Sequence, residues 1–302
     1  MVTKHLGKLA PIVLFVYNRP EHTKKTVESL LKNINAGKSS LLVYSDGPKN
    51  DFDANKIRIV RNYVRDLKGF HKIEIVEREK NLGLANSVIT GINDVFNLYD
   101  CVIVLEDDVI TAPLFLNFMN DALEFYQDDM KIFSVSGYPY PIKIPNVYNQ
   151  EVFISFRTSS WGWGTWKNRW EKADWELKDF DNFFSDKKSQ MLFNRAGEDL
   201  IQMLIAQKRN EIDSWAIRWS YTHFKNNAYC LYPVRPLCKN IGTDSSGTHS
   251  SSSEKLSVEL DQSGRGFELS RKLEINHEIS GEIQKLFKPT FFRRIFNSIK
   301  YR

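Results

Sequence analysis

The sequence has few cysteines and no long apolar run. Its three cysteines, Cys101, Cys230 and Cys238, form no CxxC pair, which argues against a disulfide framework and against a structural zinc site. No stretch approaches the roughly 20 apolar residues of a transmembrane helix, and the N-terminus lacks the apolar run of a signal peptide. We therefore expect a cytoplasmic protein.

The sequence also lacks a glycine-rich phosphate loop and an excess of charge in its main body. Neither GxGxxG nor a P-loop sequence occurs in the first predicted strand-to-helix turn, so a bound nucleotide would need another partner for its phosphates. The formal net charge of +5 arises from residues 285–302, which include six basic side chains and no acidic one. The rest of the chain is nearly neutral, so no nucleic-acid partner is expected.

Short apolar runs alternate with amphipathic helical patterns in the first hundred residues. The predicted strands are residues 11–17, 41–44, 73–76 and 101–105. Their short connections predict an α/β fold with a mainly parallel sheet and helices on both faces. Further strands are predicted at 132–136 and 152–156, further helices near 198–208 and 214–226, and a Ser/Gly/Thr-rich loop at 243–253.

Three acidic residues, Glu106, Asp107 and Asp108, directly follow the apolar run 101–105. Adjacent carboxylates at the end of a buried strand repel each other and resist desolvation, and a cation would remove that conflict. Ligands of open α/β sheets bind outside the carboxyl ends of the strands. This predicts a divalent metal that holds a phosphate. The alternative is a solvated turn before a helix whose first residue is Pro113.

The order of motifs resembles that of GT-A glycosyltransferases, both the bacterial family 2-like enzymes and the N-acetylglucosaminyltransferase I family. The motifs are NRP at 18–20, SDG at 45–47, EKNLGLANS at 79–87 and VIVLEDDVITAP at 102–113, which contains the DXD-like acidic triplet. The resemblance extends from about residue 11 to about residue 250. It implies a GT-A fold, with a Rossmann-like, mainly parallel central sheet.

The resemblance also implies how the chain is organised. Residues 1–255 form the GT-A domain, in which 1–112 are the nucleotide-binding half and 113–255 the acceptor half. Residues 256–302 form a helical tail that is basic and aromatic. The composition of 286–302 is typical of an interfacial membrane anchor, and the alternative is a terminal helix that packs its phenylalanines on the domain.

In the triplet, the resemblance implies divided roles. Asp108 matches the direct metal ligand, while Glu106 and Asp107 match contacts with the donor sugar and the ribose. A hard ion, Mn²⁺ or Mg²⁺, is expected because every candidate ligand is an oxygen atom.

Other matched positions surround the nucleotide. Arg19 matches an arginine near the nucleotide, and Asp46 matches an aspartate that accepts a hydrogen bond from uracil N3–H. Asp46-Gly47-Pro48 is also compatible with an ordinary turn. The segment that completes the nucleotide pocket contributes Asn81, Asn86 and Ser87, although Asn81-Leu82-Gly83 is also compatible with a helix entry.

The acceptor side has three candidate groups. Asp213 matches the catalytic base, with Glu211 as the alternative base and helix capping as the structural alternative for Asp213. The block containing Trp161, Gly162 and Trp163 resembles a loop that contacts donor or acceptor, and core packing is the alternative reading. His249 matches a histidine near the diphosphate, or is a solvated side chain of the 243–253 loop.

Together these features predict an inverting, metal-dependent glycosyltransferase. The expected donor is a UDP-sugar, with UDP-N-acetylglucosamine as the leading candidate, and the expected acceptor is a hydroxyl of a glycan or lipid-linked saccharide in surface polysaccharide or glycan biosynthesis. The alternatives are a nucleotidyltransferase acting on sugar phosphates and a non-catalytic nucleotide- or glycan-binding module. The C-terminal tail would allow weak contact with the inner face of the cell membrane.

Overall fold

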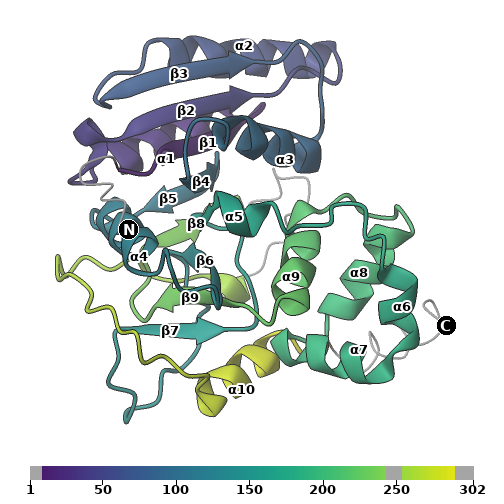
Figure 1. The fold of residues 1–302 in the computed structure, drawn as a ribbon. Helices are drawn as coiled ribbons and strands as arrows, with labels where there is room; N and C mark the ends of the chain where they lie inside the picture. Colours follow the sequence, from purple (N-terminus) through teal and green to yellow (C-terminus); the bar gives the residue numbers. More distant parts are fainter. Residues whose placement is uncertain (1–8, 243–253, 290–302) are drawn as a thin grey trace.

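The computed structural model describes residues 9–242 and 254–289. Its first part alternates strands and helices as predicted (Figure 1), in the order β1 (Ile12–Val16), α1 (Pro20–Leu31), β2 (Ser40–Ser45), α2 (Asp51–Arg65), β3 (Lys72–Glu77), α3 (Leu84–Val95) and β4 (Cys101–Glu106). These strands pair in parallel in the order β3-β2-β1-β4. The predicted α/β fold class and all four predicted strands are confirmed.

The second part extends the sheet with strands of both directions. It consists of β5 (Val109–Thr111), α4 (Phe115–Phe125), β6 (Ile132–Ser136), β7 (Val152–Ser155), β8 (Trp163–Trp166), α5 (Lys167–Trp170), α6 (Phe180–Ser185), α7 (Lys187–Phe193), α8 (Leu200–Lys208), α9 (Trp215–Lys225), β9 (Tyr229–Pro233), β10 (Cys238–Asn240) and α10 (His277–Leu286). The eight-stranded order is β3-β2-β1-β4-β8-β6-β9-β7, while β5 and β10 form a separate pair. Strand β8 runs antiparallel to both β4 and β6.

The two faces of the sheet carry separate apolar clusters, because successive side chains of a strand point to opposite faces. On one face, Val13 and Val104 pack with Val88 of α3 and Trp219 of α9. On the other face, side chains of β1 and β4 pack with those of α1, α2 and α4, including Leu14, Ile103, Val27, Val60 and Phe115. This double covering explains why β1 is apolar along its whole length and β4 is apolar as far as Leu105.

The C-terminal part packs on the second half of the sheet through α10. Ile279 and Ile283 are each 1% exposed, and the Phe287 ring centroid lies 3.3 Å from the guanidinium carbon of Arg157. The alternative in which this tail packs on the domain therefore holds as far as residue 287, while residues 290–302 lie outside the described part. Among the helices that the structure describes, none has the length and apolar character to cross a membrane.

Candidate functional site

The acidic triplet and Arg19 lie at the carboxyl ends of β4 and β1. These strands are parallel neighbours, and Phe15 is paired with Glu106. The Arg19 guanidinium forms ion pairs with both aspartates, through Nη2 with Asp107 and through Nη1 with Asp108 Oδ2 at 2.9 Å. Asp107 is 3% exposed and Asp108 is 7% exposed. The alternative of a solvated turn is therefore wrong, and α4 begins at Phe115 rather than Pro113.

One arginine only partly relieves the charge conflict. Burial raises the pKa of Glu106, and the charges of Asp108 and Asp107 raise it further against the opposing effect of Arg19. Burial also raises the pKa of Asp107, again against the effect of Arg19. Three carboxylates facing one guanidinium leave an excess of negative charge, which favours a further cation at this edge.

Asp108 is also held by the end of β10 and the two residues after it. Its Oδ1 accepts a hydrogen bond from Asn240 Nδ2 at 2.9 Å, and its carbonyl accepts one from the Ile241 amide at 2.8 Å. Gly242 packs directly against the carboxylate, where a Cβ atom would overlap Asp108 Oδ2. Asp108 is thus fixed in position, with Oδ2 directed toward Arg19.

The chemistry of this cluster fits a metal bound together with a diphosphate. Among residues 9–242 and 254–289, no group of three or more His, Cys, Asp or Glu side chains is arranged to hold a metal ion by itself. Ions such as Mg²⁺ commonly bind one or two carboxylates and complete their shell with substrate phosphates and water. Arg19 Nη1 is buried and, apart from its ion pair with Asp108 Oδ2 at 2.9 Å, has no acceptor in the described part of the chain. Asp108 and Arg19 Nη1 are therefore the groups that fit a metal and a phosphate oxygen.

Asp46 connects the end of β2 to the turn before α3. Its two carboxylate oxygens accept hydrogen bonds from the backbone amides of Leu82, Gly83 and Gly47 at 3.0–3.1 Å. Asn81 Nδ2 donates to the Gly47 carbonyl at 2.9 Å and strengthens the same connection. In this conformation Asp46 thus organises the loop between β3 and α3, and its contact with uracil stays a prediction.

The other two residues predicted in this segment lie on α3. Asn86 is exposed and donates to the Leu82 carbonyl at 3.2 Å, whereas Ser87 is buried and receives a 2.5 Å hydrogen bond from Arg78 Nη1. Arg61 of α2 reaches the same region, donating to Ser45 Oγ at 3.0 Å and to the Arg78 carbonyl at 2.7 Å.

Neither arginine was predicted as a site residue from the sequence. The position of Arg78, two residues after the predicted strand 73–76, was an available signal, because it places the residue at the carboxyl edge of the sheet. No comparable signal exists for Arg61, which occupies an ordinary helical position.

The tryptophan block divides between the core and a partly buried position beside Tyr138 and Cys238. Trp163 is 0% exposed, and its ring stacks on Trp215 with centroids 4.9 Å apart. The expected sugar contact of Trp163 is therefore corrected, since it has no face open to a ligand. Trp161 is only partly buried and packs edge-on against Tyr138, with centroids 4.5 Å apart. Its role as a sugar platform stays a prediction.

Gly162 is required by packing and by backbone conformation. Its φ of +54° lies in the left-handed region, and an added Cβ would lie 2.6 Å from Cys238 Sγ. Since Cys238 begins β10, which leads to the segment holding Asp108, Gly162 allows the tryptophan block to approach that segment closely.

Asp213 lies just before α9 and is positioned by Arg218, which lies in the first turn of that helix. Its side chain is 57% exposed, and Oδ1 lies 2.9 Å from Arg218 Nη2. The capping alternative is wrong, because Ser214 is the N-cap and accepts from the Ile217 amide at 3.3 Å. The start of α9 is near the carboxyl end of β4, since Trp215 stacks on Trp163, which is paired with Val104. The predicted His249 lies outside the described residues.

Comparisons with known proteins agree with this description. The family model for glycosyl transferase family 2 matches residues 12–201, more than half of the chain. A search of curated proteins finds no match. One similar solved structure is the mannosyltransferase PcManGT from Pyrobaculum calidifontis in complex with GDP-Man and Mn²⁺, at 14% identity and a TM-score of 0.36. The match covers 56% of this chain and 50% of that chain, and a likeness this low supports no further conclusion.

Proposed function

The chain belongs to glycosyl transferase family 2, and we propose that it is an inverting, metal-dependent enzyme that takes its sugar from a UDP-sugar. UDP-N-acetylglucosamine is the first donor to test. The acceptor is a hydroxyl of a glycan or lipid-linked saccharide, in the synthesis of surface polysaccharide or another glycan. In this proposal residues 1–112 bind the nucleotide and residues 113–255 bind the acceptor.

One observation carries the proposal. Arg19 Nη1 is buried and, beyond its ion pair with Asp108 Oδ2, has no acceptor among the described residues, and it lies in a cluster with surplus negative charge. A metal–diphosphate group supplies both missing partners, because its cation would bind Asp108 and its phosphate oxygens would accept from Arg19. Bound Mn²⁺ or Mg²⁺ would act as a Lewis acid that stabilises the leaving diphosphate.

The remaining donor contacts follow from the positions around this cluster. Glu106 and Asp107 contact the sugar and ribose, while Asp46 and Asn81 shape the loop at the nucleotide edge. Trp161 offers a partly exposed ring, against which the apolar face of a sugar would pack.

Proton transfer from the acceptor is assigned to Asp213. Its carboxylate is open to solvent and therefore accessible to an acceptor hydroxyl, and the ion pair with Arg218 restrains its orientation. Arg218 acts here as a positioning residue. It is anchored by hydrogen bonds to the carbonyls of Ser214 and Trp175, at 3.1 Å each.

The basic and aromatic C-terminal residues suggest weak contact with the inner face of a membrane. Lys285 and Lys288 are exposed at the end of α10, immediately before the remaining basic residues of the tail. A lipid-linked acceptor would be concentrated at such a surface. This part of the proposal is tested by sedimentation of the protein with anionic vesicles.

A donor-hydrolysis screen tests the donor and the metal. UDP-sugars and GDP-sugars are compared with Mn²⁺, with Mg²⁺ and with EDTA. We expect turnover of a UDP-sugar that EDTA abolishes. Turnover that EDTA leaves unchanged would refute the metal role of Asp108, and equal use of GDP-sugars would refute uracil recognition by Asp46.

Variants at the acceptor side test the base. Asp213→Asn should lower kcat by roughly 10²–10⁴-fold, the usual contribution of a general base, and leave the KM for the donor nearly unchanged. Glu211→Gln tests the alternative base, and Glu176→Gln is the control at a carboxylate whose side chain is 73% exposed. A full loss in Glu211→Gln together with an active Asp213→Asn would reverse the assignment.

A further inference from the structure

A groove of about 710 Å³ lies beside α1, on the side of β5 and β10. Helix α1 contributes residues 22, 25, 29 and 32, whose spacing places them on one face of the helix. Ile110 of β5, Ile241 after β10 and Leu260 contribute apolar surface. Neither Asp107 nor any residue of the 79–87 segment lines this groove, so the groove is distinct from the proposed nucleotide site.

The charge that lines the groove is predominantly positive. Lys25 and Lys32 project from α1 and Lys239 from β10, against one acidic side chain, Glu28. Glu28 is already 4.0 Å from Lys24, outside the groove. The partner of Lys239 is Glu259, at 4.0 Å and 95% exposed, which makes this a weak, solvent-screened pair.

Lys25 and Lys32 are not neutralised by a carboxylate of the described chain. Within residues 9–242 and 254–289 they form no ion pair. Three lysines line the groove against one carboxylate in its lining, Glu28, and this excess of positive charge attracts an anion.

The walls of the groove are held by hydrogen bonds. Asn33 Nδ2 donates to Thr111 Oγ1 at 3.0 Å, and Ser29 Oγ lies 3.3 Å from the same hydroxyl, which joins α1 to β5. The opposite wall, residues 260–262, is anchored through Asp261, whose amide donates to the Pro236 carbonyl at 2.8 Å.

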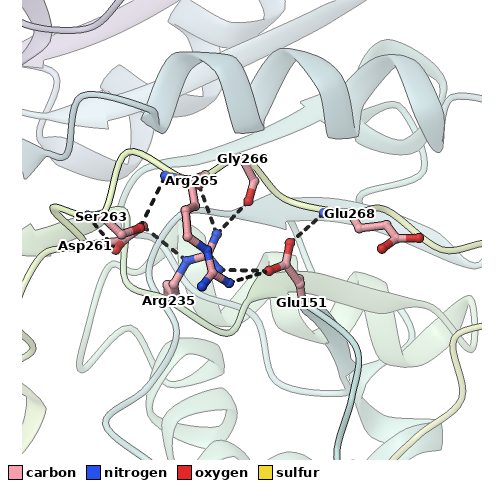
Figure 2. A network of polar contacts seen from close by, with 7 residues as sticks. All are labelled: Glu151, Arg235, Asp261, Ser263, Arg265, Gly266 and Glu268. Atoms are coloured by element: carbon pink, nitrogen blue, oxygen red, sulfur yellow. Dashed lines mark hydrogen bonds and ion pairs between the residues drawn. The ribbon is translucent and has the colours of Figure 1, made fainter.

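Figure 2 shows how that second wall is fixed to the sheet. Arg235 Nε lies 3.2 Å from Asp261 Oδ2, and its Nη1 lies 2.9 Å from Glu151 Oε1. The same arginine also donates to the carbonyls of Arg265 and Gly266 at 3.0 and 2.7 Å. A groove whose walls are fixed in this way is already formed before a ligand binds.

From this geometry we propose that the groove is a second anion site, which binds a small ligand carrying a phosphate group. The lysines bind the phosphate, and the apolar side chains of Ile110 and Ile241 contact the remainder of the ligand. Ile241 precedes Gly242, which packs on Asp108. A ligand in the groove therefore lies next to the proposed metal site at Asp108 without occupying it. The phosphate belongs either to a soluble sugar phosphate or to a lipid headgroup.

The two isoleucines serve as reporters. In protein with ¹³C-labelled isoleucine methyl groups, glucose 1-phosphate and, separately, phosphatidylglycerol vesicles are titrated while the Ile110 and Ile241 signals are followed. Ile57 of α2, whose side chain is buried at 2% exposure, is the internal control. We expect shifts at Ile110 and Ile241 with one of these ligands, weakened by added salt because ionic strength screens exposed lysines. The ligand that produces them identifies the source of the phosphate.

A matched pair of variants tests the assignment. The triple variant Lys25→Gln, Lys32→Gln, Lys239→Gln should lower the affinity by about tenfold or more. The control variant Lys68→Gln, Lys131→Gln, Lys172→Gln removes the same charge from exposed positions outside the groove and should bind normally. No shift with either ligand, or an equal affinity in both variants, would overturn the proposal. Binding of UDP with Mn²⁺ is measured in parallel, so that a failure of the donor site is recognised separately.

Discussion

Replacing Arg19 by methionine should make the protein depend on a divalent metal for its stability. Methionine keeps an unbranched side chain of similar length but removes the charge. The backbone role of Arg19 is retained, since its carbonyl still accepts from the Thr23 amide at 2.9 Å at the start of α1. The loss is therefore confined to the two ion pairs with Asp107 and Asp108.

The magnitude follows from burial. Arg19 is 15% exposed in its side chain, and its two partners are 4% and 10% exposed. Removing one member of a buried ion pair costs about 3–5 kcal/mol, because the remaining charge is left uncompensated. For a chain of this size, each kcal/mol corresponds to roughly 2–4 °C in Tm, so we expect Arg19→Met to melt about 6–20 °C lower in EDTA.

Mn²⁺ should restore much of this loss. The variant has an unpaired Asp108 and no guanidinium that competes for it, so a metal at 100 times its Kd would add about 2.7 kcal/mol. Thermal unfolding near pH 8, with EDTA or Mn²⁺, measures both effects. Arg58→Met, at an exposed arginine that hydrogen-bonds only Asn55 among the described side chains, is the control. An Arg19→Met protein as stable as the wild type, with the same response to Mn²⁺, would refute the reasoning.

Three further predictions concern other parts of the molecule. Burial lowers the pKa of His223 to about 3, below its usual 6.5, so the stability of the protein should fall as the pH drops below 6.5. Urea unfolding should show a loss of about 2 kcal/mol by about pH 5, and the variant His223→Gln should not show this loss. Trp163→Ala should cost about 3–5 kcal/mol of stability, whereas Trp161→Ala should mainly lower kcat/KM; the opposite pattern would return Trp163 to the ligand side. Gly162→Ala should cost at least about 1 kcal/mol of stability because its backbone is left-handed. Adding Cys238→Ala to this variant should recover only the part of the loss that is due to overlap with Cys238 Sγ.

The sign of the His223 prediction follows from its hydrogen bonds. Its Nδ1–H donates to the Trp219 carbonyl at 3.0 Å, and Nε2 lies 2.8 Å from Ser134 Oγ, which donates to it when the ring is neutral. Protonation would place a fully buried charge against Trp219 and Phe133 and reverse the Ser134 bond. The folded state therefore takes up this proton far less readily than the unfolded state.

Much of the first half of the fold was predictable from local patterns. Residues 12–16 and 101–105 are continuous apolar runs because helices cover both faces of these strands, and such runs are visible in a sequence. Strand β8 was missed, because its sequence Trp-Gly-Thr-Trp belongs to a block rich in tryptophan and small residues that suggests a ligand loop. What makes this segment a strand is its pairing with β4 and β6, both distant in the sequence.

The sequence by itself determined the strand–helix alternation, the order of the motifs and the presence of three carboxylates at the end of a buried strand. These depend on period, composition and spacing, which are local properties of the chain. Only the tertiary structure decided that Arg19 pairs with Asp107 and Asp108, that Trp163 is buried while Trp161 is partly open, and that three lysines from α1 and β10 meet in one groove. Each of these depends on which distant side chains burial brings into contact, and no local pattern encodes that choice.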